Sequence, residues 1–135
     1  GGVSMSKMPH ITEAEWVVMR QLWKESPLTA ADIVERVRSE KQLEPTTIKT
    51  LLRRLIAKGA ANFSVDEKNP KIYWYFPLVM EEECVTDKSR HFLSLYYKND
   101  VEKLFATFVD NEALSDTEIQ SLQNLLERKK GKPDA

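Results

Sequence analysis

The chain has few of the residues that build catalytic or nucleotide-binding loops. Only four of its 135 residues are glycines, and three of these lie near the chain ends, which excludes a glycine-rich phosphate loop. The two histidines, His10 and His91, lie far apart, and no Ser/His/Asp arrangement or nucleophile elbow accompanies them. The sequence therefore predicts a protein that is not an enzyme and uses no cofactor.

Cysteines and long apolar runs are scarce as well. Cys84 is the only cysteine, so no intramolecular disulfide can form, and the chain fits a reducing cytoplasm. Cys84 and His91 could share a helical face, but two ligands do not complete a metal site, so we expect packing or surface roles for both. No apolar run approaches the roughly 18 residues that cross a bilayer. We expect a cytoplasmic protein without membrane insertion.

The start of the chain, GGVSMSKM, lacks the apolar region of a secretory signal. We interpret residues 1–8 as a disordered, cloning-derived extension.

Charge is distributed unevenly, although the net charge is only −1. Residues 1–76 carry 12 Lys/Arg and 9 Asp/Glu, whereas residues 77–119 carry 4 Lys/Arg and 10 Asp/Glu. No acid occurs between Glu44 and Asp66. A locally basic domain followed by an acidic arm indicates that one surface faces an anion.

The first half of the chain predicts three amphipathic helices. Capping boxes beginning at Thr12 and Thr29 open the first two, which end near Lys24 and Lys41. The third runs through EPTTIKTLLRRLIAKG, residues 44–59, with a proline in its first turn and a glycine at its end. Its apolar positions follow helical spacing and are expected in the core: Ile48, Leu51, Leu52 and Leu55.

The other face of this third helix is polar, basic and free of acids. A helix of this kind suits the major groove of DNA, where Arg and Lys reach guanine and Thr contacts base edges or the thymine methyl. The predicted DNA-contacting residues of this helix are Thr46, Thr47, Lys49, Thr50, Arg53, Arg54 and, toward the phosphates, Lys58. The competing interpretation is an ordinary solvated face, with Arg54 paired to Glu35 or Glu40.

A β-hairpin is predicted directly after the third helix. Apolar and polar residues alternate on both sides of the turn cluster 66–70, which is the pattern of two strands. Lys68 and Lys71 near the tip could touch phosphate or the minor groove, or the tip could be a plain surface turn diluted by neighbouring acids. Tyr73 and Tyr75 could reach phosphate or simply cover the sheet.

After Pro77 the pattern returns to short amphipathic helices, near residues 81–97, 101–109 and 115–126. Val85 is expected among the contacts of the first. Such helices have little to bury against in a short arm, which favours dimerisation. The predicted dimerisation residues are Phe92, Tyr96, Val101, Leu104, Phe105, Phe108, Ile119, Leu122 and Leu126.

The order of elements predicts a mainly α protein. Residues 9–77 form a winged helix-turn-helix with three helices and a hairpin wing, and residues 78–129 form a helical dimerisation arm. Residues 130–135 are expected to be a frayed tail.

Several segments together resemble the BlaI/MecI/CopY penicillinase repressor family of bacterial transcriptional repressors. They include ITEAEWVVMRQLW, PTTIKTLLRRLIAKG, KIYWYFPL, FLSLYYKND and VEKLFATFVDNEALSDTEIQSLQNLL, and the similarity covers about residues 9–129. The C-terminal part is more similar to the β-lactam branch than to the copper branch, whose C-x-C repeat this chain lacks.

This resemblance implies a homodimer that binds double-stranded operator DNA with TACA and TGTA half-sites, read by the threonines and basic residues of the third helix. It also implies relief of repression by proteolysis in the arm, after a membrane sensor metalloprotease detects the inducer. The matching bond is Thr107–Phe108, where β-lactam members have Asn–Phe.

Two other functions stay open at this stage. One is a winged helix that binds protein instead of DNA, which the near-neutral net charge favours. The other is a metal-responsive repressor that uses Cys84, His91 and carboxylates. The sequence leaves the inducer, the target genes and the operator spacing open.

Overall fold

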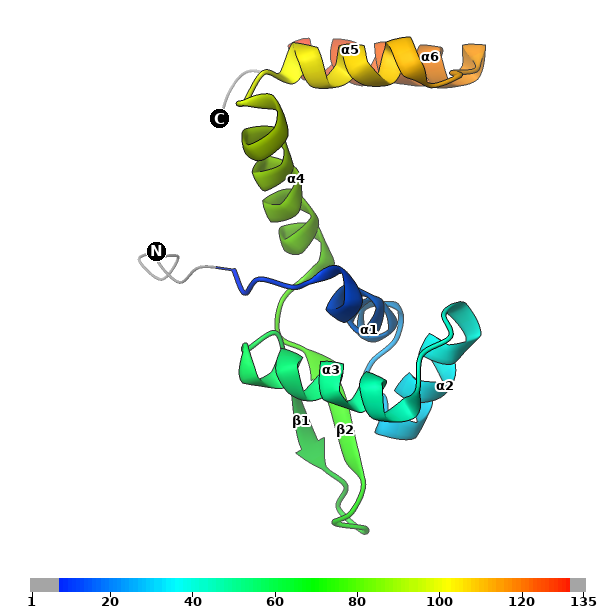
Figure 1. The fold of residues 1–135 in the computed structure, drawn as a ribbon, viewed down its shortest axis with the longest axis vertical. Helices are drawn as coiled ribbons and strands as arrows, with labels where there is room; N and C mark the ends of the chain where they lie inside the picture. The colour runs from blue at the N-terminus through cyan, green and yellow to red at the C-terminus, as the bar shows by residue number, and fades with distance from the viewer. Residues whose placement is uncertain (1–7, 132–135) are drawn as a thin grey trace. The chain divides into compact units, whose positions relative to one another are not determined.

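The computed structural model describes residues 8–131, which form six helices and one two-stranded sheet. The helices are α1 (Glu13–Lys24), α2 (Ala30–Glu40), α3 (Pro45–Ala57), α4 (Glu81–Tyr97), α5 (Val101–Asn111) and α6 (Asp116–Lys130), and the strands are β1 (Ala61–Val65) and β2 (Tyr73–Pro77) (Figure 1). The chain divides into two compact units, Gly1–Lys88 and Ser89–Ala135.

Local signals fix the ends of the first three helices. Thr12 accepts a hydrogen bond from the N–H of Glu15, whose carboxylate accepts one from the N–H of Thr12, and Thr29 opens α2 with the same kind of box. Pro45 lies in the first turn of α3, where its missing N–H breaks no intrahelical bond. Gly59 follows α3 with a φ of 80°, a left-handed conformation that favours glycine. The predicted starts and ends of these helices are confirmed.

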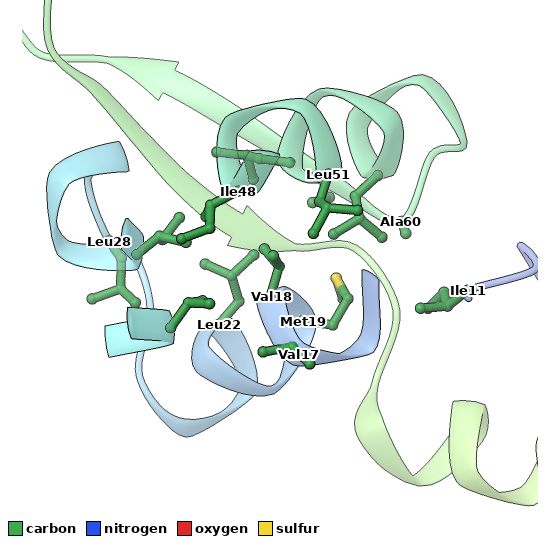
Figure 2. Packing of buried hydrophobic residues seen from close by; sticks show 14 of the residues in the cluster. Ile11, Val17, Val18, Met19, Leu22, Leu28, Ile48, Leu51 and Ala60 are labelled. Atoms are coloured by element: carbon green, nitrogen blue, oxygen red, sulfur yellow. The ribbon is translucent and has the colours of Figure 1, made fainter. Parts of the chain in front are cut away.

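The apolar faces of α1, α2 and α3 meet in one core. Figure 2 shows Val18 of α1 together with Ile48 and Leu51 of α3 in the space between the helices. The largest fully buried apolar side chains are Ile11, Val18, Met19, Leu22, Ile33, Val37, Ile48 and Leu55. Each such burial contributes about 1.5–3 kcal/mol, so the first unit holds its fold through its own side chains.

The hairpin extends from these helices as an antiparallel pair in which Phe63 lies opposite Tyr75 and Val65 opposite Tyr73 (Figure 1). Leu28 joins it from the connection between α1 and α2. The Leu28 N–H donates to the Tyr75 carbonyl at 3.0 Å, and the Tyr75 N–H donates to the Leu28 carbonyl at 2.7 Å. Three helices with a hairpin docked in this way form a winged helix-turn-helix, which confirms the predicted fold class.

The beginning of α4 packs onto the winged helix. The Trp23 indole N–H donates to the Val79 carbonyl at 2.9 Å, and Cys84 is only 3% exposed within the core. One residue further along the helix the side chain is turned by about 100°, so Val85 faces outward, and its predicted contact stays a prediction. The first compact unit therefore extends to Lys88, beyond the boundary expected at residue 77.

The second unit contains the end of α4 followed by α5 and α6. Lys98 and Asn99 both have positive φ values and end α4, and Asp100 then caps α5 by accepting from the Lys103 N–H at 3.0 Å. Ser115 forms the predicted capping box ahead of α6. None of the residues 89–131 is buried, so the helices of this unit are set by local signals and not by a core.

Two predictions concern the chain ends. Residues 1–7 and 132–135, most of the expected cloning-derived extension and frayed tail, lie outside the described residues. Met8, also assigned to that extension, instead packs against the core, and Lys130 closes α6. None of the helices within residues 8–131 combines the length and the apolar character that a bilayer crossing requires.

Candidate nucleic-acid interface

The polar face of α3 is open to solvent along its whole length. Ile48, Leu51, Leu52 and Leu55 turn into the core, which orients the remaining side chains of the helix outward. The predicted reading residues Thr46, Thr47, Lys49, Arg53 and Arg54 are exposed, and Thr50 is half-buried. The α3 side chains predicted to read DNA thus occur together on one surface.

Hydrogen bonds distinguish the three threonines of this face. The Thr50 hydroxyl donates to the Thr46 carbonyl at 3.0 Å and accepts from the Arg53 guanidinium at 3.1 Å. Among residues 8–131, the hydroxyls of Thr46 and Thr47 have no such partner. Thr47 therefore presents both a free hydroxyl and a methyl group, whereas Thr50 serves to orient Arg53.

A groove runs between α3 and the hairpin and carries only positive charge. Lys49 and Arg53 line it from α3, Lys71 lines it from the hairpin, and Thr29 lies at its edge, at the start of α2. No acidic side chain lines this groove. This arrangement suits a polyanion.

The floor of the groove is aromatic. Phe63 stacks on Tyr73 with ring centroids 4.4 Å apart and planes 6° from parallel, and both rings contact Tyr75. Burial raises the pKa of the Tyr75 hydroxyl, and Tyr73 adds to the rise. Tyr75 is therefore a neutral hydrogen-bond donor at physiological pH. Tyr73 and Tyr75 cover one face of the sheet, which is one of the two roles predicted for them. They also line the groove.

The tip of the hairpin presents Lys68 and Lys71, both exposed. The neighbouring Asp66 faces the turn: it accepts hydrogen bonds from two backbone N–H groups and from the Trp74 indole. The bond from Trp74, followed by those from the backbone, holds the pKa of the Asp66 carboxyl below its usual value. The Asp66 carboxylate is thus ionised and hydrogen-bonded within the hairpin. Glu67 is the second acidic residue of this turn.

Lys58, predicted to contact phosphate, also has partners within the chain. Its ammonium group forms an ion pair with Glu15 and also donates to the His10 carbonyl at 2.8 Å. Glu15 is 2% exposed, and although burial raises its pKa, hydrogen bonds from Lys58 and Thr12 bring the value below normal. Lys58 compensates a buried carboxylate, and its contact with DNA phosphate stays a prediction.

Arg54 does not form the alternative pair with Glu35 or Glu40. Glu40 instead accepts from Lys24 at 3.0 Å and from Gln21 at 2.9 Å. Within residues 8–131, no salt bridge involves Arg54. Its guanidinium group therefore stays available on the open face of α3.

The residues considered for metal binding lie in ordinary surroundings. Cys84 packs in the core, where burial, with help from Glu83 and Asp87, raises the pKa of its thiol. His91 is exposed on α4. In the part of the chain that the structure describes, no three His, Cys, Asp or Glu side chains gather as a metal site would require.

The predicted dimerisation residues lie in the second unit on surfaces open to solvent. Leu104 is half-buried, and the other eight are exposed: Phe92, Tyr96, Val101, Phe105, Phe108, Ile119, Leu122 and Leu126. The Thr107–Phe108 bond lies inside α5. The Thr107 hydroxyl donates to the Lys103 carbonyl at 2.9 Å, so this bond belongs to a regular helical turn.

The sequence did not reveal how the groove is assembled. The sequence predicts a helix cap at Thr29 and a strand before the turn 66–70, and neither pattern places Thr29 or Phe63 in a groove. They join Arg53 because the backbone of Leu28 pairs with that of Tyr75, a contact between segments 47 residues apart. No local pattern announces a pairing of that kind.

Comparison with known proteins is consistent with this interface. The family model described as penicillinase repressor matches residues 11–128. The methicillin resistance regulatory protein MecI of Staphylococcus aureus (strain N315) is 36% identical, over 92% of this chain and 98% of that protein. The penicillinase repressor of Bacillus licheniformis is 33% identical, over 95% of this chain and 98% of that protein.

A solved structure is similar to part of this chain. The solution structure of the Bacillus licheniformis BlaI monomeric form in complex with the blaP half-operator has a TM-score of 0.50 and 33% sequence identity. It covers 58% of this chain and 93% of that chain. Together with the matches along nearly the whole sequence, this shows that the chain belongs to the penicillinase repressor family, whose members are DNA-binding regulators and not enzymes.

Proposed function

We propose that this chain is a homodimeric transcriptional repressor that binds a dyad-symmetric operator through α3 and the hairpin. The observation that carries the proposal is the acid-free groove between the exposed face of α3 and the wing, lined by Lys49, Arg53 and Lys71. It occurs in a chain of the penicillinase repressor family. A monomeric form of BlaI has been solved with a half-operator, which supports one half-site for each winged helix.

Base reading is assigned to the N-terminal two turns of α3. Thr46, Thr47 and Lys49 are exposed there, and recognition helices contact base edges with the residues of this end. With its free hydroxyl and methyl group, Thr47 can contact both a base edge and a thymine methyl. TACA and TGTA half-sites, expected for the family, contain such thymines.

Phosphate contacts are assigned to the groove and the wing tip. When a helix occupies the major groove and a hairpin approaches the adjacent minor groove, the backbone strand between them crosses the space that separates helix and hairpin. Arg53 and Lys71 flank that space, and Arg54 and Lys68 lie free beside it. We expect these four cations to bind phosphates, which fix register without reading sequence.

The second unit supplies the dimer contact. Eight of the nine predicted dimerisation residues are exposed, and no residue from 89 to 131 is buried, which leaves three amphipathic helices without a core. A second copy of the same arm would cover these side chains in a self-complementary interface. Linking two readers in this way raises operator affinity by about 10²–10⁴ over a single reader.

Relief of repression would then act on the arm and leave the reading face intact. Cleavage at Thr107–Phe108 would separate α6 and the end of α5 from the rest of the chain. The bond lies in a helical turn, so a protease must unwind α5 before it can bind the bond in extended form. A membrane sensor metalloprotease is the expected partner for this step. The sequence does not identify the inducer that such a sensor would detect.

A gel-shift titration at about 0.15 M salt, near physiological ionic strength, tests the proposal. The probe is a duplex with a TACA…TGTA dyad, and the control is the same duplex with both half-sites scrambled. We expect two protomers per dyad and clear preference over the control. Equal binding to both duplexes contradicts sequence-specific repression and favours the alternative, a winged helix that binds protein.

Thr47→Ala tests the assignment of base reading within the same titration. It should lower the preference for the dyad about tenfold, the low end for a base-edge contact. Thr86→Ala, at an exposed threonine of α4, is the matched control and should change nothing. If Thr47→Ala weakens binding to both duplexes equally, Thr47 does not read a base.

A further inference from the structure

The wing tip is built around one carboxylate. Asp66 follows β1 directly, and its Oδ2 accepts from the N–H of Lys68 at 3.1 Å and from the N–H of Asn69 at 2.9 Å. Its Oδ1 accepts from the indole N–H of Trp74 at 3.0 Å. One side chain thus ties the turn to both strands of the hairpin.

A second side chain extends the network to the other lysine. The Asn69 Oδ1 accepts from the N–H of Lys71 at 3.0 Å, and the Asn69 carbonyl accepts from the N–H of Ile72 at 3.0 Å. The Asp66 N–H in turn donates to the Ile72 carbonyl at 2.9 Å. The backbone N–H groups of Lys68 and Lys71 are therefore both held by side-chain oxygens of the turn.

These contacts change the electrostatic role of Asp66. Read from the sequence alone, its charge dilutes that of the neighbouring lysines. In the structure its two oxygens face three N–H donors, and the lysine side chains project to solvent. Asp66 therefore orders the loop that carries Lys68 and Lys71, and its carboxylate oxygens are occupied by the three N–H donors.

We propose that Asp66 and Trp74 are positioning residues, which hold Lys68 and Lys71 ready for the sugar–phosphate backbone before the operator arrives. The inference rests on the proposed function, because it assumes that the wing meets DNA. A turn that is ordered in the free protein loses little conformational entropy on binding, and this is how preorganisation raises affinity. The bond between the two residues is the link between the turn and β2.

Two single variants and their combination in the full-length protein test the link. Trp74→Phe keeps an aromatic ring and removes the indole N–H, whereas Asp66→Asn keeps one acceptor oxygen for the turn. Each should lower operator affinity about two- to tenfold, the range for one lost hydrogen bond. The double variant should lose little more than either single variant, because both changes break the same bond.

The decisive measurement is the slope of log affinity against log salt for the operator duplex. Each lysine that stops contacting a phosphate should reduce this slope by about one. Trp23→Phe is the matched control: it removes an indole hydrogen bond of 2.9 Å to the Val79 carbonyl, which follows β2 at the end of the hairpin opposite the wing tip. It should leave the slope unchanged, even where it costs more stability than Trp74→Phe in urea unfolding.

The indole region of a ¹⁵N–¹H NMR spectrum reports the bond without DNA. The chain has three tryptophans, and Asp66→Asn should shift the indole signal of Trp74 while those of Trp16 and Trp23 stay in place. The amide protons of Lys68 and Lys71 should exchange faster with solvent in both single variants. Unchanged indole signals and exchange rates would overturn the inference.

The affinity measurements separate the two proposals. A wild-type chain without preference for the dyad contradicts the proposed function and the inference with it. A wild-type chain that prefers the dyad, together with unchanged affinity and salt slope in Trp74→Phe and Asp66→Asn, overturns the inference alone.

Discussion

The two compact units of this chain differ in whether their apolar side chains are buried. In the first unit, α1, α2, α3 and the start of α4 share one core, and side chains such as Val18, Ile48 and Leu55 are fully buried. In the second, Phe92, Phe105 and Leu126 are all at least 44% exposed. Both units have capped helices, so capping makes a helix but does not make a self-sufficient fold.

This difference has a direct consequence for function. A unit with its own core can present a reading surface as a monomer, whereas the second unit leaves its apolar side chains open to the partner copy that we propose. In the function that we propose, the interface and the reader are separated along the chain, so loss of dimerisation should leave α3 unchanged. The experiments below are arranged from the largest expected effect to the smallest.

Removal of the second unit tests the separation most severely. A chain that ends at Lys88 keeps the whole core and should unfold cooperatively as a monomer. Its affinity for the full dyad should fall about 10²–10⁴, the contribution of linking two readers. Sedimentation and gel shift at fixed salt measure the two quantities. A truncated chain that still binds the dyad as tightly as the full chain would show that the arm is not the link.

Two leucine truncations compare the units side chain by side chain. Leu55→Ala empties a fully buried site and should lower the free energy of unfolding by about 2–5 kcal/mol. Leu126→Ala removes the same atoms from a site that is 63% exposed and should leave the unfolding of the first unit unchanged. Its effect should appear in the dimer dissociation constant. Equal losses in urea unfolding for both variants would contradict the contrast.

The Lys58–Glu15 pair offers a test inside the first unit. Lys58→Ala leaves a buried carboxylate without its cation and should cost on the order of 3 kcal/mol of stability. Arg54→Ala, without a salt bridge in residues 8–131, should change stability little and weaken DNA binding instead. The Glu15→Gln/Lys58→Met double variant should recover part of the loss. If Lys58→Ala is fully stable, the pair is not needed.

The same pair gives a pH dependence whose sign can be worked out. The pKa of Glu15 is lower in the folded chain than in the unfolded one, so the folded state binds fewer protons in this range. The stabilisation is complete above the usual glutamate pKa of about 4.3 and is lost as the pH falls through the folded value. Urea unfolding of wild type and Glu15→Gln across this range should differ in slope. If the free energy of unfolding depends on pH in the same way in both proteins, Glu15 does not cause the pH dependence.

The smallest effect concerns one glycine from each unit. Gly59→Ala should lower the free energy of unfolding by about 1–2 kcal/mol, because a residue with a Cβ is strained at a φ of 80°. No neighbouring atom would clash with the added Cβ, so the backbone conformation is the only source of this strain. Gly131 has a φ of −79° and should accept alanine without loss. Thermal unfolding of the two variants compares them. Equal melting temperatures would show that the turn after α3 relaxes freely.

Much of the fold and part of the candidate site could be predicted from the sequence. Capping boxes, Pro45, Gly59 and the alternation in the hairpin are local signals, and each defined an element boundary within a few residues. The outward face of α3 followed from the spacing of its four core leucine and isoleucine positions. Helical periodicity fixes direction once one face is known to be buried.

The sequence was least informative where a distant residue decides the surroundings of a side chain. Lys58 is a basic residue next to the predicted reading face, as a phosphate contact would be. Its ammonium group forms an ion pair with Glu15, 43 residues away. Val85 and Cys84 are neighbours of similar hydrophobicity, and only the packing of α4 on the core decides which one is buried. Asp66 similarly changes from a diluting charge to the centre of a turn because Trp74 lies opposite it.

By itself, the sequence determined where the helices and strands begin and end, which face of α3 stays polar, and how much apolar surface the arm leaves uncovered. These properties depend on residues within one or two turns of each other, where spacing and capping decide the energy. Only the tertiary structure decided that Leu28 docks the hairpin, that an acid-free groove joins α3 to the wing, and that the ammonium group of Lys58 pairs with the buried Glu15. Those outcomes depend on contacts between distant segments, which exist only once the core has brought them together.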